Sequence, residues 1–153
     1  PHYVAESAVT KHGKRTMFNK AIFLALALAV MPAAVASKTS TSMEKKLQAS
    51  LKTYELAVRW NDFEAASQAL DPLTQQGELF SEQDEAYYKG FQITGYMLKS
   101  ASMGEDLIYT QRVELRIVDQ DTQAERTKTD RQRWRYDAAA KRWWLTSGLP
   151  KLD

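Results

Sequence analysis

Two aromatic-rich runs near the end of the chain constrain its fold more than any other feature. They lie within Asp130–Leu149, on either side of a short stretch rich in polar residues and alanine. Alternating apolar and polar residues that flank such a stretch are typical of a β-hairpin. Aromatic side chains bury a large apolar area, so this hairpin should be the platform on which the rest of the chain packs. Three of the four tryptophans lie in it: Trp134, Trp143 and Trp144.

The length of the turn sets which residues face each other across this hairpin. A five-residue turn at Asp137–Lys141 would place Trp134 opposite Trp144 and Arg135 opposite Trp143. Aromatic and cation–π pairs of this kind contribute about 0.5–1 kcal/mol each. We therefore predict this register, with the Trp144 side chain in the core.

Helices are predicted before the hairpin. Apolar residues recur at steps of three and four over Met43–Arg59, which predicts an amphipathic helix whose start is marked by a capping box at Thr41–Glu44. A second helix should follow a cap at Asn61 and end before Pro72, and a third should follow a cap at Ser81. The apolar stripe of the first helix consists of Met43, Leu47, Leu51, Tyr54 and Val58.

From Phe91 onward the apolar pattern changes to alternation, which is typical of strands with one face in water. A charged turn is expected at Glu105-Asp106 and a hairpin loop at Asp119–Gln123. The predicted strands cover residues 92–100, 109–117, 124–136 and 143–147. Helices followed by a run of antiparallel strands predict an α+β fold, with N-terminal helices packed on a curved, cone-like antiparallel sheet.

Residues 17–36 match the three parts of a secretory signal peptide. A basic start leads into an apolar run at Ala21–Val30, and small residues close the segment at Ala34-Val35-Ala36. The predicted cut lies between Ala36 and Ser37, so we expect an exported protein, periplasmic or secreted, that contacts the membrane only through its signal peptide. An uncleaved anchor is the alternative, although an apolar segment of about 16 residues is short of the roughly 20 that a spanning helix needs.

Three further segments follow from this division. Residues 1–16 precede Met17 and are expected not to belong to the native protein. Residues 37–42 are predicted to form a flexible leader, and residues 43–153 a single α+β domain.

The residue types left after the predicted cut exclude several kinds of chemistry. The chain has no Cys, and both His2 and His12 precede the cut. Thiol nucleophiles, disulfides, His-assisted catalysis and the usual zinc, haem and copper ligand sets are therefore excluded, and no metal or other cofactor is expected. The 17 basic and 18 acidic residues from Ser37 onward give a net charge of −1, which offers no reason to expect nucleic acid.

A family resemblance adds to this interpretation. The order of the predicted elements resembles that of the nuclear-transport-factor-2-like superfamily. A long helix comes first, a second helix opens at Arg59–Ala66 and ends near Asp71-Pro72, and the strands that follow end in Trp143-Trp144-Leu145. That cone-shaped α+β fold is shared with ketosteroid isomerases and scytalone dehydratase. The stretches Ile93–Tyr96 and 143–150 also resemble small uncharacterised envelope proteins of bacteria.

The resemblance implies a domain that binds a protein partner or a small ligand in the cell envelope without catalysis. Enzymes of the superfamily place a carboxylate base, a Tyr and often a second acid or His inside the cone, so an isomerase or dehydratase is the alternative. No residue of this chain is assigned to those roles, because no His remains after Ala36 and no Asp falls on the apolar face of Tyr109–Val118. An enzyme is therefore the less favoured prediction.

Two groups of residues are candidates for binding. Aromatic residues could line a pocket in the cone, and an arginine-rich strand could bind an anionic polymer or surface. For the strand we favour the simpler interpretation that it is a solvated face of the sheet. A homodimer formed through the sheet is a further prediction. Arg112, Glu114 and Arg116 are interpreted as an exposed charge ladder. The pocket candidates are Tyr54, Trp60, Tyr88, Tyr96, Tyr109, Trp134 and Trp144, and the anionic-surface candidates are Arg131, Arg133, Arg135 and Arg142.

Overall fold

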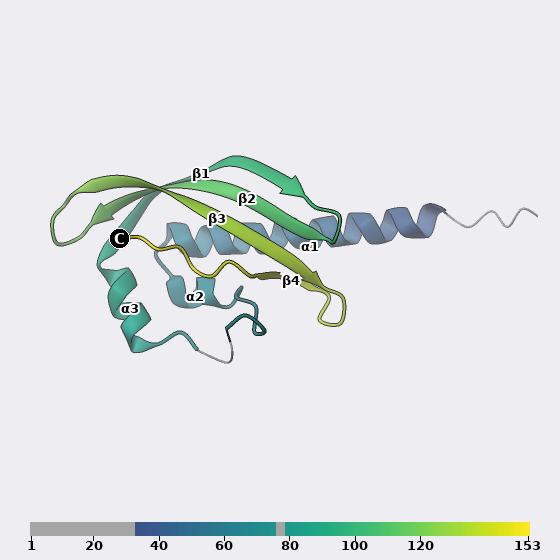
Figure 1. The fold of residues 1–153 in the computed structure, drawn as a ribbon, viewed down its shortest axis with the longest axis horizontal. Helices are drawn as coiled ribbons and strands as arrows, with labels where there is room; N and C mark the ends of the chain where they lie inside the picture. Colours follow the sequence, from purple (N-terminus) through teal and green to yellow (C-terminus); the bar gives the residue numbers. More distant parts are fainter. Residues whose placement is uncertain (1–32, 76–78) are drawn as a thin grey trace, which may run out of the picture. The chain divides into compact units, whose positions relative to one another are not determined.

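A computed structural model describes residues 33–75 and 79–153, with side chains from residue 41 onward (Figure 1). The expected upstream segment and the predicted signal peptide up to residue 32 lie outside the described residues. The elements, in chain order, are helices α1 (Ala33–Arg59), α2 (Phe63–Ser67) and α3 (Glu82–Lys89) and strands β1 (Phe91–Met103), β2 (Ile108–Asp119), β3 (Glu125–Asp137) and β4 (Arg142–Leu145).

Helix α1 begins at Ala33, ten residues before the start predicted from the capping box. Nothing between Ala33 and Met43 interrupts a helix, because the stretch lacks glycine and proline. The helix therefore also includes residues 37–42, for which a flexible leader was expected. The predicted stripe faces the core: Leu47, Tyr54 and Val58 are buried, while Met43 and Leu51 are half-buried.

The cap of α2 lies one residue later than predicted. The carboxylate Oδ1 of Asp62 accepts a hydrogen bond from the backbone N–H of Ala65 at 2.9 Å. Asn61 has a φ of 58°, a left-handed conformation that Asn tolerates better than most residues. Its amide instead ties this turn to β1, donating to the Phe91 carbonyl at 2.6 Å and accepting from the Ile93 N–H at 2.8 Å. The capping box of α3 at Ser81 is confirmed.

The four strands form one antiparallel sheet in the order β1-β2-β3-β4. Helix α1 runs beneath this sheet and contacts β1 and β4 (Figure 1). We call the side of the sheet on which α1 packs the inner face, and the opposite side the outer face. The predicted α+β fold, with helices and an antiparallel sheet, is confirmed. Buried inner-face residues are Ile93, Val113, Leu115, Ile117, Trp134, Trp143 and Leu145.

The predicted register of the last hairpin is wrong by one residue. Trp134 pairs with Leu145, Arg135 with Trp144, and Tyr136 with Trp143. The chain turns over residues 138–141, and Asp137 Oδ1 accepts from the backbone N–H groups of the second and third of these at 3.0 Å each. Because side chains alternate along a strand, a shift of one residue exchanges the two faces.

The shift places the two neighbouring tryptophans on opposite faces. Trp143 packs on the inner face with 1% of its surface exposed, and its indole N–H donates to the Met43 carbonyl at 3.1 Å. Trp144 lies half-buried on the outer face, with the guanidinium of Arg142 3.7 Å from the centre of its ring. The predicted pairs of Trp134 with Trp144 and of Arg135 with Trp143 do not form.

Candidate functional site

The inner face carries a network of polar side chains between α1 and the sheet. Gln132 lies at its centre: its Nε2 donates to Asp130 Oδ2 at 2.7 Å and to the hydroxyl of Tyr96 at 3.0 Å. Its Oε1 accepts from Gln111 Nε2 at 2.7 Å and from the Trp134 indole at 3.3 Å. Buried polar groups of this kind need partners, and the two glutamine amides supply most of them.

Two polar side chains of this region, Asp130 and Tyr54, are buried at a cost in free energy. Burial raises the pKa of the Asp130 carboxyl, and the hydrogen bond from Gln132 offsets part of that rise. The Tyr54 hydroxyl is buried, and among the described residues it has no hydrogen-bond partner. Burial, and then the nearby charge of Asp130, raise the pKa of Tyr54 well above its usual value. The inner face is therefore polar at its centre but enclosed.

The outer face has a groove of about 400 Å³ where β1, β2 and β3 lie side by side. Strand pairing arranges its outward-pointing side chains in two rows across the sheet. One row consists of Ser102, Thr110 and Arg133, and the other of Ser100, Arg112 and Arg131. We call these six residues the arginine groove.

The three arginines of the groove lie close to one another. Arg112 faces Arg131 directly across the β2–β3 pair, a position in which the Cβ atoms of facing residues are about 5 Å apart. Arg133 is two residues along β3 from Arg131, on the same face, and the side chains of all three are exposed. Within residues 33–75 and 79–153, none of the three guanidinium groups takes part in an ion pair or a hydrogen bond.

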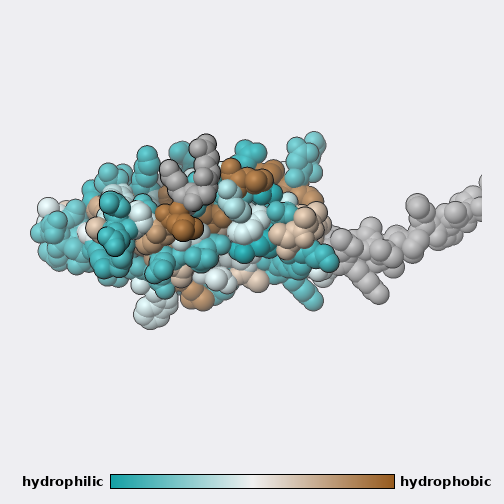
Figure 2. Space-filling view, turned by 90° about the horizontal axis from the view of Figure 1, so that it is seen from below, coloured by the Kyte–Doolittle hydropathy of each residue, from teal (hydrophilic) through white to brown (hydrophobic). Residues whose placement is uncertain are grey.

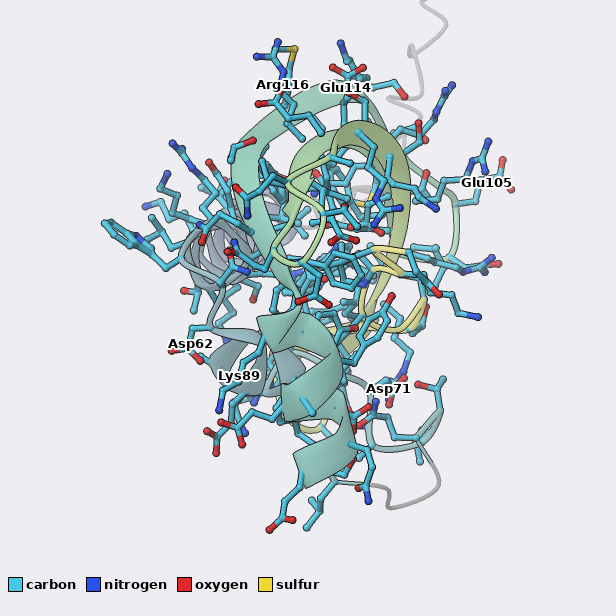
Figure 3. All side chains as sticks on the ribbon, turned by 90° about the vertical axis from the view of Figure 1, so that its left-hand side faces the viewer. Asp62, Asp71, Lys89, Glu105, Glu114 and Arg116 are labelled. Atoms are coloured by element: carbon cyan, nitrogen blue, oxygen red, sulfur yellow. The ribbon has the colours of Figure 1, made fainter. Side chains whose placement is uncertain are left out.

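The charged residues that border the groove are already paired. On one side, Lys99 Nζ lies 3.2 Å from Glu114 Oε2. On the other side, Arg135 binds Asp71 through both Nε and Nη2, the second contact measuring 2.8 Å. The hydrogen bond from Arg135 is the main reason why the pKa of Asp71 lies below its usual value. Three unpaired positive charges are thus grouped in the groove, while Arg116, farther along β2 beyond Glu114, is also without an ion pair among the described residues. Figure 3 shows Glu114 and Arg116 pointing outward from this face.

Two of the hydroxyl groups of the groove are held in place by a hydrogen bond. The hydroxyls of Ser102 and Thr110 are hydrogen-bonded to each other at 2.9 Å. Between Leu98 and Ser100 the pairing of β1 with β2 shifts by one residue, a bulge that re-aims the strand. The groove therefore offers hydroxyls from β1, a hydroxyl and a guanidinium from β2, and guanidinium N–H groups from β3.

The predicted pocket residues do not form a single pocket. Tyr54 and Trp134 meet edge to face at 5.4 Å and line a cleft of about 240 Å³ between α1 and α2, and Tyr96 joins the polar network of the inner face. Tyr88 lines a different cleft, beside α3. Tyr109 also joins that network, donating to Gln111 Oε1 at 3.1 Å. The other two are separate: Trp60 is 80% exposed, and Trp144 lies on the outer face.

Two of the four predicted anionic-surface residues, Arg131 and Arg133, lie in the groove. Arg135 is on the same face but is bound to Asp71, and Arg142 stacks on Trp144 and donates to the Gln68 carbonyl at 3.1 Å. Sequence reasoning missed Arg112, which it assigned to a charge ladder. It also missed the hydroxyls, which are Ser100, Ser102 and Thr110. Only the strand register could have identified them.

Hydrophobic side chains are also exposed on the side of α2 and α3, where Figure 2 shows them in separate patches among hydrophilic residues. The most exposed large apolar residues are Leu79, Trp60 and Leu73. In the described part of the chain no helix is long and apolar enough to span a membrane. Among the same residues, His, Cys, Asp and Glu side chains form no group of three or more that could hold a metal ion.

Comparisons of the chain with models of protein families, with curated proteins and with solved structures find no match. The function proposed below is therefore argued from the geometry of the chain alone.

Proposed function

We propose that this domain is a non-catalytic binding module and that it binds an anionic ligand in the arginine groove. The proposal includes export to the cell envelope and a cone-like fold of the nuclear-transport-factor-2-like kind. The observation that carries the proposal is the grouping of Arg112, Arg131 and Arg133 around one groove without an acidic partner among the described residues.

The cost of this grouping supports a binding role. Like charges that face each other directly across two strands destabilise a sheet. A chain that placed arginines only for solubility could separate them or alternate them with acids, as β2 does at Arg112, Glu114 and Arg116. A bound anion would remove the repulsion, and guanidinium groups bind oxyanions with charge-assisted hydrogen bonds.

The enzyme alternative has one observation in its favour. Asp130 is a carboxyl with a raised pKa, near the hydroxyls of Tyr54 and Tyr96, a combination suited to general acid–base chemistry. A reacting group must also reach the carboxyl, and Asp130 lines neither the clefts beside α1 and α3 nor the groove on the outer face. We therefore favour binding over catalysis.

The predicted homodimer through the sheet fits this proposal poorly if the outer faces meet. Two copies joined in that way would bring their arginine grooves together and add repulsion between unpaired charges. A partner of opposite charge is the better complement to this face.

Binding to a soluble polyanion tests the proposal. Heparin would be titrated into the protein at low ionic strength, where surface charges are screened least. Losing two arginines that each make a charge-assisted contact should weaken binding by about tenfold or more, so we expect this loss for Arg131→Gln/Arg133→Gln.

The matched control is Lys52→Gln/Arg59→Gln. Both residues lie on α1 and pair with Glu55, and the net charge changes by the same amount. The control should bind within about twofold of the unchanged protein, because only net charge is altered. An equal loss in both variants, or no binding of either heparin or a small phosphate or sulfate ester by the unchanged protein, would refute an anion site in the groove.

A further inference from the structure

The shape of the arginine groove narrows the class of ligand, an inference that rests on the proposed function. We infer that the groove is a compact site for one tetrahedral oxyanion ester, a phosphate or sulfate monoester on a small molecule. It would not be a track for a long anionic chain.

The extent of the unpaired charge favours a compact site over an extended one. Beyond Arg112 along β2 comes Glu114, paired with Lys99, and beyond Arg133 along β3 comes Arg135, bound to Asp71. A long polyanion laid along β2 would leave the three free cations of the groove and meet the acidic Glu114 before it reached Arg116, and one laid along β3 would meet an arginine whose charge is already satisfied. The free cations therefore match one anionic group.

The kind and number of hydrogen-bond donors in the groove favour an oxyanion ester over a carboxylate. A monoester presents three terminal oxygens, with about 1.5 to 2 negative charges if it is a phosphate. A carboxylate presents two oxygens in one plane, which a single guanidinium fork can satisfy. Three forks and three hydroxyls around one groove exceed what a carboxylate can use. They suit a group with oxygens pointing in several directions.

The use of arginine rather than lysine also favours an ester group as the ligand. All three groove cations are arginines, although the chain has lysines nearby, at Lys99 and Lys128. Arginine holds its donors in a rigid fork, whereas lysine acts as a flexible point charge. The facing positions of Arg112 and Arg131 allow two forks to approach one ester group from both sides.

The experiment measures Kd for three small probes by ¹H–¹⁵N NMR titration of the full chain: glycerol 3-phosphate, glucose 6-sulfate and malonate. Malonate carries two negative charges but no tetrahedral group. We expect at least one of the esters to bind about tenfold or more tighter than malonate. The largest shifts should fall on the amides of Ser100, Ser102, Thr110 and their neighbours. Which ester binds more tightly distinguishes phosphate from sulfate as the source.

The conservative variant Arg112→Lys separates this inference from the proposed function. Lysine keeps the charge but loses the fork, so heparin binding should stay within about threefold while binding of the preferred ester falls by about tenfold. If heparin binds in an arginine-dependent way but the esters bind no tighter than malonate, the compact site is wrong and the anion-binding module stands. If neither heparin nor the esters bind, both are wrong.

Discussion

Strand β3 presents two different sets of side chains to the two faces of the sheet. Asp130, Gln132 and Trp134 point to the inner face and are buried, whereas Arg131 and Arg133 point to the outer face and are exposed. Each face holds charge without an opposite charge beside it. On the inner face that charge is a buried carboxyl, and on the outer face it is a group of guanidiniums beside an open groove.

This difference shows that access to solvent, rather than charge alone, decides whether an unpaired charged group can bind a ligand or only destabilises the fold. Burial raises the pKa of Asp130, so its ionised form is disfavoured, and the carboxyl lines neither the groove nor the clefts beside α1 and α3. The arginines keep their charge in water and can exchange solvent for a ligand. Five substitutions test this contrast between the faces.

The two adjacent tryptophans give the largest predicted difference. Trp143→Ala removes a fully buried indole from the inner face and should lower the free energy of unfolding by about 3–5 kcal/mol. Trp144→Ala removes a half-buried ring from the outer face and should cost about 1 kcal/mol or less. Urea denaturation of both variants measures the two losses. Equal losses, or the reverse order, would contradict the observed register.

The ion pair of Asp71 with Arg135 should give the second largest effect. Asp71→Ala leaves a partly buried guanidinium without its two charge-assisted hydrogen bonds, at a cost of about 2 kcal/mol at pH 7. The pKa of Asp71 is lowered in the folded state, so its stabilising contribution is present above pH 3.8 and is lost as the pH falls through the lowered pKa. Unfolding curves between pH 2 and pH 7 should therefore converge for variant and unchanged protein at the acid end.

Asp130→Asn should behave in the opposite way. The raised pKa of Asp130 means that its favourable contribution is complete below pH 3.8 and is lost as the pH rises through the raised pKa. Asparagine keeps an acceptor for Gln132 but carries no charge. We expect the variant to be equal to or up to about 1 kcal/mol more stable than the unchanged protein at pH 7. A loss of more than about 2 kcal/mol at pH 7 would show that the ionised carboxyl has a partner in the folded protein.

The smallest effect on stability is expected in the groove. Arg131→Thr removes one of two facing positive charges and introduces a residue that favours strands, so stability should change by no more than about 0.5 kcal/mol, in the stabilising direction. Thermal unfolding measures this change, with Arg59→Thr on α1 as the exposed control. A clear destabilisation would mean that the arginine is retained for folding rather than for binding.

Much of the fold follows from sequence patterns. The steps of three and four in α1, the cap at Ser81 and the alternation along β2 and β3 are local signals, because they depend on the geometry of a single element. The candidate site was only half predicted. Arg131 and Arg133 were identified from their own strand, but Arg112 belongs to another strand.

Whether Arg112 lies beside the two predicted arginines depends on the length of the loop between β2 and β3. The predicted hairpin loop, Asp119–Gln123, would pair Val118 with Ala124 and place Arg112 opposite Asp130, which resembles an ordinary salt bridge. In the structure Val118 pairs with Glu125, so Arg112 faces Arg131, while Asp130 points to the other face. One additional loop residue thus converts an apparent ion pair into a cluster of like charges.

The sequence by itself determined which segments are helices and strands and which side chains of a strand share a face, since both follow from backbone periodicity. Tertiary structure decided the registers, through side chains that reach beyond their own element. Asp137 fixes the last turn by accepting from the N–H groups of its loop, and Asn61 fixes the start of β1 from 30 residues away. Successive side chains of a strand point to opposite faces of the sheet. Each such contact therefore determines the face on which every following side chain lies, and so the residues that it contacts.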